Sequence, residues 1–339
     1  MGALTDYQKT PVILPRFTGQ RLSGRNPFMC KLSTNNTQIM NIRNATGLTV
    51  EGLGFTHNID TNALRADEFI DETVSAVFTT SVYPSADVTL RNNLWNSVSG
   101  TCIDIYGEGS ERWQVIGNRA LDLGLAFLYA SVKSQDHIIA LNHVLNPGDA
   151  TIVFNGPSRN NLALGNHIRF RGERHVLSGG TGGAGFVTQG KFNLHASNVI
   201  ADCGGSFVQV MTGLDGAENT TAEGNLYVGN MFDGNIIDDD SADTFGQFIL
   251  RSQDGDALNV FSDNMVRGKN TLDLIHSRDP SHGAPYTEGH WIFRDVDAIG
   301  MRHVWYCVAP GKTMTLKNCT FRDVLGDELF YLNDDEAIW

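Results

Sequence analysis

The sequence predicts an all-β solenoid, a stack of coils made of short strands, and three observations support this prediction. One phrase recurs along the chain: an Asn with apolar or small residues four and two positions before it and two positions after it. Apolar and polar residues alternate on both sides of this Asn, which is typical of two short strands that meet at a corner. The copies around Asn142, Asn166 and Asn198 are 24 and 32 residues apart, and repeats of this length are typical of solenoids.

The Asn suits a corner because it adopts positive φ angles at a lower cost than most residues other than Gly. Weaker copies of the phrase mark further corners in both directions. The predicted corners lie at residues 52, 92, 118, 142, 166, 198, 230, 264, 295 and 318. We therefore expect about ten coils of three strands each. We also expect the Asn side chains of neighbouring coils to stack and to hydrogen-bond with one another.

Taken in order, the chain begins the solenoid almost at once, and we expect 1–339 to form a single domain. Residues 1–37 are predicted to form two strands around a Gly-containing turn. Residues 38–334 are predicted to form the regular coils, interrupted by a longer polar segment at 59–85. The predicted third strands of the coils lie at 101–106, 126–131, 150–155, 206–211, 245–250, 271–276, 303–308 and 328–333. Long loops are predicted at 179–192, 212–224, 237–245 and 277–290. Long loops on one side of a solenoid build a binding groove.

Composition narrows the range of partners. The net charge of −13 argues against nucleic acid, whose phosphates are bound by basic surfaces. No apolar stretch reaches the length of a membrane span, and the start of the chain lacks the apolar core of a signal peptide. The five cysteines are odd in number and have no metal-like spacing, so we expect small buried side chains and no disulfide bonds.

Coils of this length that turn at an Asn resemble the right-handed parallel β-helix of the pectin-lyase-like superfamily. The phrase GLTVEGLGFTHN at residues 47–58 is similar to early-coil phrases of pectate lyases, polysaccharide lyases and phage tailspike depolymerases. The resemblance implies a right-handed parallel β-helix that binds and degrades polysaccharide. The acidic composition, the β-rich start and the lack of a leader favour the tailspike branch. By analogy with that branch we expect a homotrimer on the virion surface or in another extracellular location.

The catalytic motifs of these families are incomplete in this chain. The acidic run at 238–240 and the SHG at 281–283 are isolated fragments of the polygalacturonase set. The segment 291–294 is similar to a pectate-lyase phrase, but it has no Asp where calcium would bind. Three consecutive Asp supply too few oxygens for calcium by themselves. We therefore expect no cofactor, because no motif supports calcium.

The candidate site follows from the geometry of the coils, because equivalent positions on adjacent coils lie about 4.8 Å apart. Alternation predicts that Leu272 and Leu274 point inward and that Asp273 points outward, in the midst of a cluster of polar residues. The same reasoning places Gln247, Arg251, His303 and Trp305 on the outer face. The candidate catalytic residues are Asp273, His276, His282 and Arg251; the candidate substrate-binding residues are Trp305, His303, Gln247, Arg278, Asp279 and Tyr286.

Each of these residue types suits a carbohydrate. Asp273 with His276 or His282 would exchange protons, since His titrates near neutral pH. Arg251 would pair with the carboxylate of an acidic sugar, and Trp305 would stack on a sugar ring. If these residues do not form the site, the alternative candidates are a smaller set of outward-pointing residues: Asp104, Tyr106, Glu108 and Tyr129.

Two classes of function fit this pattern. The favoured class is a polysaccharide-degrading enzyme, either a hydrolase or a lyase. A hydrolase needs two carboxyl groups, about 5 Å apart in a retaining enzyme and about 9 Å apart in an inverting one. A lyase needs a cation to neutralise the sugar carboxylate and a base to remove a proton. The alternative class is a non-catalytic β-helix, such as an adhesin or a structural tail protein that binds glycans.

Overall fold

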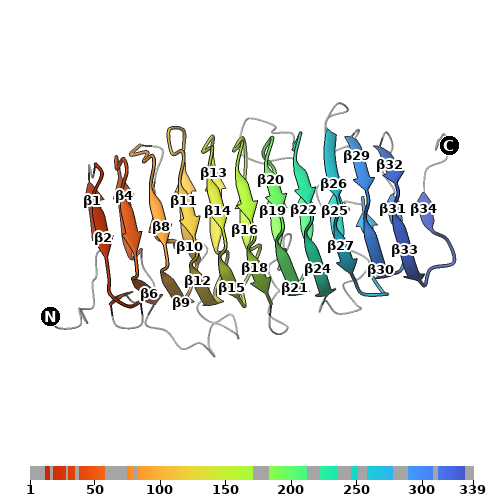
Figure 1. Cartoon of the computed structure of the whole chain (residues 1–339), viewed down its shortest axis with the longest axis horizontal. Helices are drawn as coiled ribbons and strands as arrows, with labels where there is room; N and C mark the ends of the chain where they lie inside the picture. Colours follow the sequence, from red (N-terminus) through yellow and green to blue (C-terminus); the bar gives the residue numbers. More distant parts are fainter. Residues whose placement is uncertain are drawn as a thin grey trace.

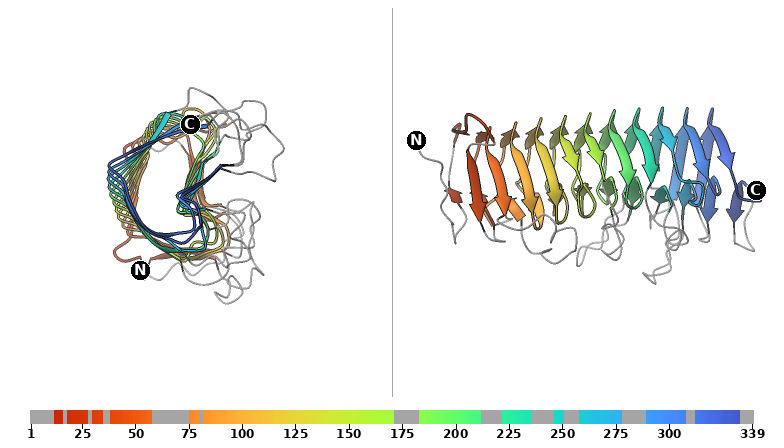
Figure 2. Two further views of the ribbon diagram at one scale, coloured as in Figure 1. Left: turned by 90° about the vertical axis from the view of Figure 1, so that its right-hand side faces the viewer. Right: turned by 90° about the horizontal axis from the view of Figure 1, so that it is seen from below.

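We describe the chain from a computed structural model, which places residues 12–15, 18–27, 30–34, 38–57, 75–79, 82–170, 183–211, 222–235, 246–250, 258–277, 289–307 and 312–332. Within these ranges the chain forms three parallel sheets that run the length of the molecule (Figure 1). Viewed along the axis, successive coils superpose on one another (Figure 2). None of the described segments forms a helix that is long and apolar enough to cross a membrane.

Sheet A has twelve strands and contains the predicted third strands of the coils. Its strands are β1 (Val12–Pro15), β4 (Met40–Arg43), β7 (Ser75–Phe78), β10 (Thr101–Tyr106), β13 (Leu128–Ser131), β16 (Ile152–Phe154), β19 (Phe186–Thr188), β22 (Val208–Val210), β25 (Phe248–Leu250), β28 (Ile275–His276), β31 (Trp305–Cys307) and β34 (Phe330–Leu332).

Sheet B has eleven strands and precedes the Asn corner in each coil. Its strands are β2 (Arg21–Ser23), β5 (Thr49–Glu51), β8 (Thr89–Arg91), β11 (Gln114–Ile116), β14 (Ile138–Ala140), β17 (Leu162–Leu164), β20 (Leu194–Ala196), β23 (Leu226–Val228), β26 (Leu258–Ser262), β29 (Gly289–Arg294) and β32 (Lys312–Lys317).

Sheet C has eleven strands and follows the same corner. Its strands are β3 (Lys31–Thr34), β6 (Gly54–His57), β9 (Leu94–Val98), β12 (Arg119–Leu123), β15 (His143–Leu145), β18 (His167–Arg169), β21 (Val199–Cys203), β24 (Met231–Asn235), β27 (Met265–Arg267), β30 (Asp297–Met301) and β33 (Thr320–Val324).

Each strand pairs in parallel with its counterparts in the preceding and the following coil, as β14 does with β11 and β17. The prediction of an all-β, right-handed parallel β-helix is therefore confirmed, with about eleven coils where the sequence predicted about ten. In sheets B and C the middle residue of most short strands points inward, as in β17 and β18. Stacked aromatic rings fill part of the interior, and the rings of Tyr227, Phe261 and Phe293 lie 4.4 and 4.7 Å apart.

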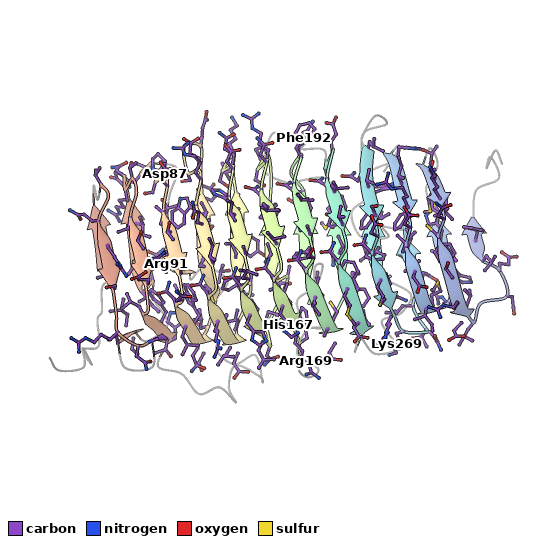
Figure 3. All side chains as sticks on the ribbon, viewed as in Figure 1. Asp87, Arg91, His167, Arg169, Phe192 and Lys269 are labelled. Atoms are coloured by element: carbon purple, nitrogen blue, oxygen red, sulfur yellow. The ribbon has the colours of Figure 1, made fainter. Side chains whose placement is uncertain are left out.

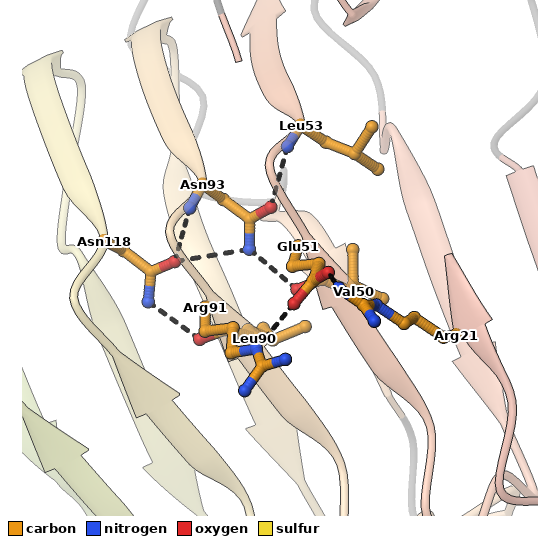
Figure 4. Close-up of polar contacts among 8 residues, drawn as sticks. All are labelled: Arg21, Val50, Glu51, Leu53, Leu90, Arg91, Asn93 and Asn118. Atoms are coloured by element: carbon orange, nitrogen blue, oxygen red, sulfur yellow. Dashed lines mark hydrogen bonds and ion pairs between the residues drawn. The ribbon is translucent and has the colours of Figure 1, made fainter. Parts of the chain in front are cut away.

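The predicted Asn ladder is present at the corner between sheets B and C. The amide of Asn142 donates to Oδ1 of Asn166 at 2.9 Å, and Asn166 donates to Asn198 at 3.0 Å. The ladder continues to Asn264 at one end and to Asn93 at the other, where Figure 4 shows Asn93 donating to Asn118 and to the carbonyl of Val50. Each side chain thus satisfies backbone and side-chain groups in two neighbouring coils.

Positive φ, the predicted reason for Asn, applies at Asn92 and Asn318 but not at the Asn residues of the ladder. The residue with positive φ is the one before the ladder Asn, as at Leu141 with φ 56° and Ser197 with φ 55°. The Asn is required because its amide joins the coils. The shift also corrects four predicted corner residues, because Gly52, Asn92, Asp295 and Asn318 have the positive φ and the ladder position is the residue that follows each of them, as Asn93 follows Asn92. At positions 296 and 319 the ladder position holds Val and Cys.

A second ladder, which we did not predict, lies at the corner before sheet B. Oδ1 of Asn193 accepts the backbone N–H of Asn161, and Asn225 and Asn259 continue the series. In four coils each second-ladder Asn comes five residues before its counterpart in the first ladder. The repeated spacing Asn-x4-Asn was the sequence signal that would have revealed it.

Candidate active site

The outer face of sheet A carries one side chain per coil in a continuous strip. The strip is fixed by register, because the residues on either side of each member point into the core. Its members are Asp104, Tyr129, Val153, Val187, Gln209, Ile249, His276 and Tyr306. The middle is apolar: Val153 and Val187 form a small buried cluster with Ala150, Ala184 and Met211. Chemically active groups therefore lie towards the two ends of the strip.

At the C-terminal end, the carboxylate of Asp273 is fully buried and accepts four contacts. Its Oδ1 accepts from Nε of Arg302 at 3.0 Å and lies 2.8 Å from Nδ1 of His303. Its Oδ2 accepts from Nη2 of Arg302 at 3.0 Å and lies 3.0 Å from Nδ1 of His276. Burial raises the pKa of Asp273, but the hydrogen bonds from His276, Arg302 and His303 outweigh burial and lower the pKa to about 2. The group is thus an anion at neutral pH.

This anion fixes the tautomer of His276. An ionised carboxylate only accepts hydrogen bonds, so Nδ1 of His276 carries a proton, and the neutral tautomer that fits this contact has its lone pair on Nε2. Nε2 is buried and has no hydrogen-bond partner among the residues that the structure describes. The imidazole stacks on the ring of Tyr306 in the next coil, with ring centroids 5.0 Å apart and an angle of 5° between the planes. A carboxylate that orients a His in this way prepares its other nitrogen as a base or a ligand.

The local backbone leaves room for His276. A Cβ added to Gly246 would lie 2.4 Å from Cβ of His276, so this position in the preceding coil has to be Gly. Arg302 reaches Asp273 from the turn before β31, and its guanidinium lies 6.0 Å from the centroid of the Tyr306 ring. His303 comes from the same turn. Two consecutive turns and two strands of sheet A therefore build the cluster.

The structure brings together three predicted site residues, Asp273, His276 and His303. Sequence reasoning missed Arg302 and Tyr306. Tyr306 could have been found, because its ring occupies the strip position of its coil. The predicted residues Arg251, Arg278, Asp279, His282 and Tyr286 lie outside the described residues. What is said of them stays a prediction.

Two predicted orientations were wrong. Trp305 shares its register with Ile275 and Phe330, points into the core with 9% exposure, and donates its indole N–H to Oγ of Ser277 at 3.0 Å. It is therefore not placed to stack on a sugar. Gln247 is fully buried and donates to the carbonyl of Gly300 at 2.9 Å.

Asp273 also differs from its prediction, because its side chain is fully buried rather than exposed. Leu272 and Leu274, predicted to point inward, are buried as expected. The reason for the error is that residues 271–274 form the turn before β28. Strict alternation does not hold in a turn, so Asp273 is enclosed together with its apolar neighbours.

The N-terminal end of the strip holds the smaller predicted set. Asp104 and Tyr129 are adjacent in register, and the hydroxyl of Tyr129 donates to Oδ2 of Asp149 at 3.5 Å. Asp149 is buried, so this end contains two carboxyl groups next to one phenol. Glu108 lies apart from them, exposed, with Nζ of Lys133 at 4.0 Å. Within the described residues, no group of three or more His, Cys, Asp or Glu could hold a metal ion.

Comparisons with known proteins show the fold. No protein-family model matches the chain, and no curated protein matches its sequence. The catalytic domain of Agl-KA superposes with a TM-score of 0.66 at 12% identity, covering 96% of this chain and 59% of that chain. The catalytic unit of a GH87 alpha-1,3-glucanase from Streptomyces thermodiastaticus gives 0.57 at 13% identity, covering 98% and 66%.

A GH136 lacto-N-biosidase from Eubacterium ramulus gives a TM-score of 0.56 at 13% identity, covering 92% of this chain and 62% of that chain. The chain thus spans about three fifths of the length of these structures. At such low identity the similarity shows a fold shared with β-helix enzymes that act on carbohydrates.

Proposed function

We propose that the protein binds polysaccharide along the outer face of sheet A and cleaves it with His276 as the base. The observation that carries this proposal is the buried Nε2 of His276, which has no hydrogen-bond partner within the described part of the chain and whose ring is oriented by Asp273. A buried nitrogen without a partner costs about 1–3 kcal/mol, and this cost is recovered when a ligand proton reaches it. The fold supports a carbohydrate ligand, because similar β-helices act on glycans.

A lyase acting on a uronic-acid-containing glycan is the reaction that this end of the strip fits best. Nε2 of His276 removes the proton from C5 of the sugar, the electron pair forms the C4–C5 double bond, and the bond from C4 to the glycosidic oxygen breaks. The leaving oxygen takes a proton, for which the phenol of Tyr306 in the next coil is the proposed donor. Arg251 is the proposed cation for the sugar carboxylate.

Asp273 does not serve as the acid in this scheme. Its pKa of about 2 means that it carries no proton at neutral pH, and its four contacts leave it enclosed. It is a positioning residue for His276. This division of roles differs from the sequence prediction, which gave Asp273 a direct part in the chemistry.

Hydrolysis is a second candidate, favoured by one observation at the other end of the strip. Asp104 and Asp149 both lie beside Tyr129, and a glycosidase uses two carboxyl groups. Three further parts of this proposal rest on analogy alone. They are the tailspike-like character, the virion-surface or extracellular location, and the homotrimer. The non-catalytic adhesin or tail protein is the competing class.

The experiment is incubation with a panel of neutral and acidic polysaccharides, assayed for new reducing ends and for ultraviolet absorbance of an unsaturated sugar. We expect both signals with an acidic glycan, and loss of both in His276→Ala. The matched control is His167→Ala, an exposed His on sheet C. Reducing ends without absorbance, lost in Asp104→Asn, would favour the hydrolase. Binding without any product would favour the non-catalytic class.

A further inference from the structure

Three consecutive coils turn from sheet A to sheet B at residues 107–110, 131–134 and 155–158, directly after or shortly after β10, β13 and β16. Each turn is closed by a hydrogen bond from the backbone N–H of its fourth residue to the carbonyl of its first. Of the two central residues of each turn, positive φ occurs at Gly109 in the first, at both Val132 and Lys133 in the second, and at Gly156 in the third. The three turns therefore bend in different ways.

A cavity of about 270 Å³ lies at these turns. The volume is close to the lower end of ligand pockets, about 300 Å³, and suits a single sugar ring. Figure 3 shows the edge of the solenoid on which this corner lies, labelled at Asp87 and Phe192, which directly follow two members of the row of paired residues that contains Gln135 and Arg159. Three coils contribute to the lining, which consists of Glu108, Gly109, Lys133, Gln135, Pro157 and Arg159.

The cavity holds two cations that no acid neutralises at close range among the residues described. The side chain of Arg159 makes one hydrogen bond within that part of the chain, from Nε to Oε1 of Gln135 at 2.8 Å, so both Nη groups are left to donate to a ligand. The carboxylate of Glu111, in the same row, is held by Arg112 and Gln135. Nζ of Lys133 lies 4.0 Å from Oε2 of Glu108, beyond hydrogen-bond distance. The cavity can therefore attract an anion, although the chain as a whole has a net charge of −13.

The turn that presents Lys133 is strained. Val132 has a φ of 52°, and a β-branched residue at positive φ is a genuine outlier. Gly would adopt the same conformation without strain. Strained backbone is concentrated at ligand-binding and catalytic sites, where it fixes the position of a functional side chain. The strain at Val132 therefore supports a binding role for Lys133.

We infer that this cavity binds an acidic sugar of a glycan. The carboxylate of the sugar accepts from Nη of Arg159 and from Nζ of Lys133, because charge-assisted hydrogen bonds are the strong ones. Glu108 and Gln135 bind the hydroxyl groups, and the ring of Pro157 gives an apolar contact to one face of the sugar. The choice of a glycan as the ligand rests on the proposed function, whereas the cavity and its two cations are independent of it.

The cavity is separate from the end of the strip that holds His276. Its middle coil is that of β13, and the path to β28 passes β16, β19, β22 and β25. Five steps of about 4.8 Å give a separation of about 24 Å along the axis. A glycan that reaches both places runs along the solenoid, with an acidic sugar in the cavity several units away from the bond that is cleaved. The cavity thus selects acidic glycans and takes no part in the chemistry.

Isothermal titration calorimetry on the His276→Ala chain, from which the proposed base is removed, tests the cavity. The probes are hexamers of galacturonate and of mannuronate, an uncharged glucose hexamer, and inorganic sulfate. We expect an acidic hexamer to bind at least about tenfold more tightly than the glucose hexamer, and its affinity to fall as salt is added. Arg159→Gln and Lys133→Gln, each in the same background, should lower this affinity by at least about tenfold. The matched control is Arg119→Gln, which removes the same charge from an exposed position of sheet C and should leave the affinity unchanged.

Several results overturn the inference. They are acidic hexamers that do not bind, a glucose hexamer that binds equally well, and an affinity that Arg159→Gln or Lys133→Gln leaves unchanged or that Arg119→Gln lowers as much. Sulfate binding that depends on the two cations, without binding of either acidic hexamer, shows a site for inorganic anions and also overturns it. Circular dichroism establishes that the variants fold.

The proposed function is judged separately, from cleavage by the native chain. Cleavage that needs His276, without binding in the cavity, retains the proposed function and removes this inference. Binding in the cavity without cleavage by the native chain has the opposite meaning.

Discussion

Nδ1 of His276 lies 3.0 Å from Oδ2 of Asp273, and both side chains are buried on the outer side of sheet A. Three further contacts, two from Arg302 and one from His303, hold the same carboxylate. In this pair Asp273 determines the tautomer of His276. Asp273 is kept ionised, so it orders the proton on His276 and leaves Nε2 as the reactive nitrogen.

Asp273→Asn should therefore reduce cleavage far more than substrate binding. The amide can present its NH₂ group to Nδ1, which favours the other tautomer of His276 and removes the lone pair from Nε2. We expect kcat to fall by at least about tenfold while KM changes little. The pH profile of kcat is the decisive readout, because a purely structural loss would lower activity equally at all pH values. A variant with native kcat and pH profile would contradict the positioning role.

Acid should destabilise the protein below about pH 6.5 because of two buried histidines. Burial lowers the pKa of His137 and of His195 to about 3. The unfolded chain, with ordinary His pKa values, binds protons more readily, so stability is complete above the unfolded pKa of about 6.5 and declines as the pH falls towards 3. Thermal unfolding as a function of pH measures this decline.

The matched variant is His195→Phe, which keeps an aromatic ring in the stack with Tyr227, 4.6 Å away. It should unfold with a shallower pH dependence between pH 6.5 and 4 than the native protein. Asp273 acts in a lower window, since its stabilising contribution is lost only as the pH falls from about 3.8 towards 2. An unchanged slope in His195→Phe would show that this His is protonated in the folded state.

The solenoid was predictable because its signals are local. Alternation on both sides of Asn142 and Asn166 marks the strands and the corner, and the interval between them gives the coil. The hydrogen-bond partner of each ladder Asn follows from the repeat, because it is the Asn at the same position of the next coil. The second ladder, through Asn193, was equally visible in the sequence as a fixed spacing of five residues.

The site was only partly predictable because the position at which a strand begins decides which of its side chains point inward and which point outward. Alternation counted from Val304 placed Trp305 outward, but the strand begins at Trp305 and the inward position falls there. The contact between Arg302 and Asp273 joins residues 29 positions apart, from two turns of neighbouring coils. No local pattern encodes that contact.

Asn166→Leu should destabilise the solenoid by about 1–3 kcal/mol. The substitution removes the acceptor for the backbone N–H of Asn142 and the donor to the carbonyl of Ile139, and both groups are buried. Leu cannot replace either bond. Chemical denaturation measures the loss, with Asn96→Leu on the partly exposed outer face of sheet C as the control. Equal stability of the two variants would show that the ladder contributes nothing beyond packing.

A comparison of Trp305→Ala with Tyr306→Ala should distinguish a core residue, whose loss lowers stability, from a residue of the strip on sheet A, whose loss lowers activity. Trp305 packs inward beside Ile275 and Phe330, so its loss leaves a large cavity and should cost about 3–5 kcal/mol of stability. Tyr306 faces outward and stacks on His276, so its loss should reduce cleavage with a smaller effect on stability. Unfolding and activity are measured on the same preparations, below the unfolding temperature of the weaker variant. If Trp305→Ala instead keeps the native stability and loses glycan binding, the sugar-stacking role first predicted for Trp305 is correct. Its inward orientation in the structure would then be wrong.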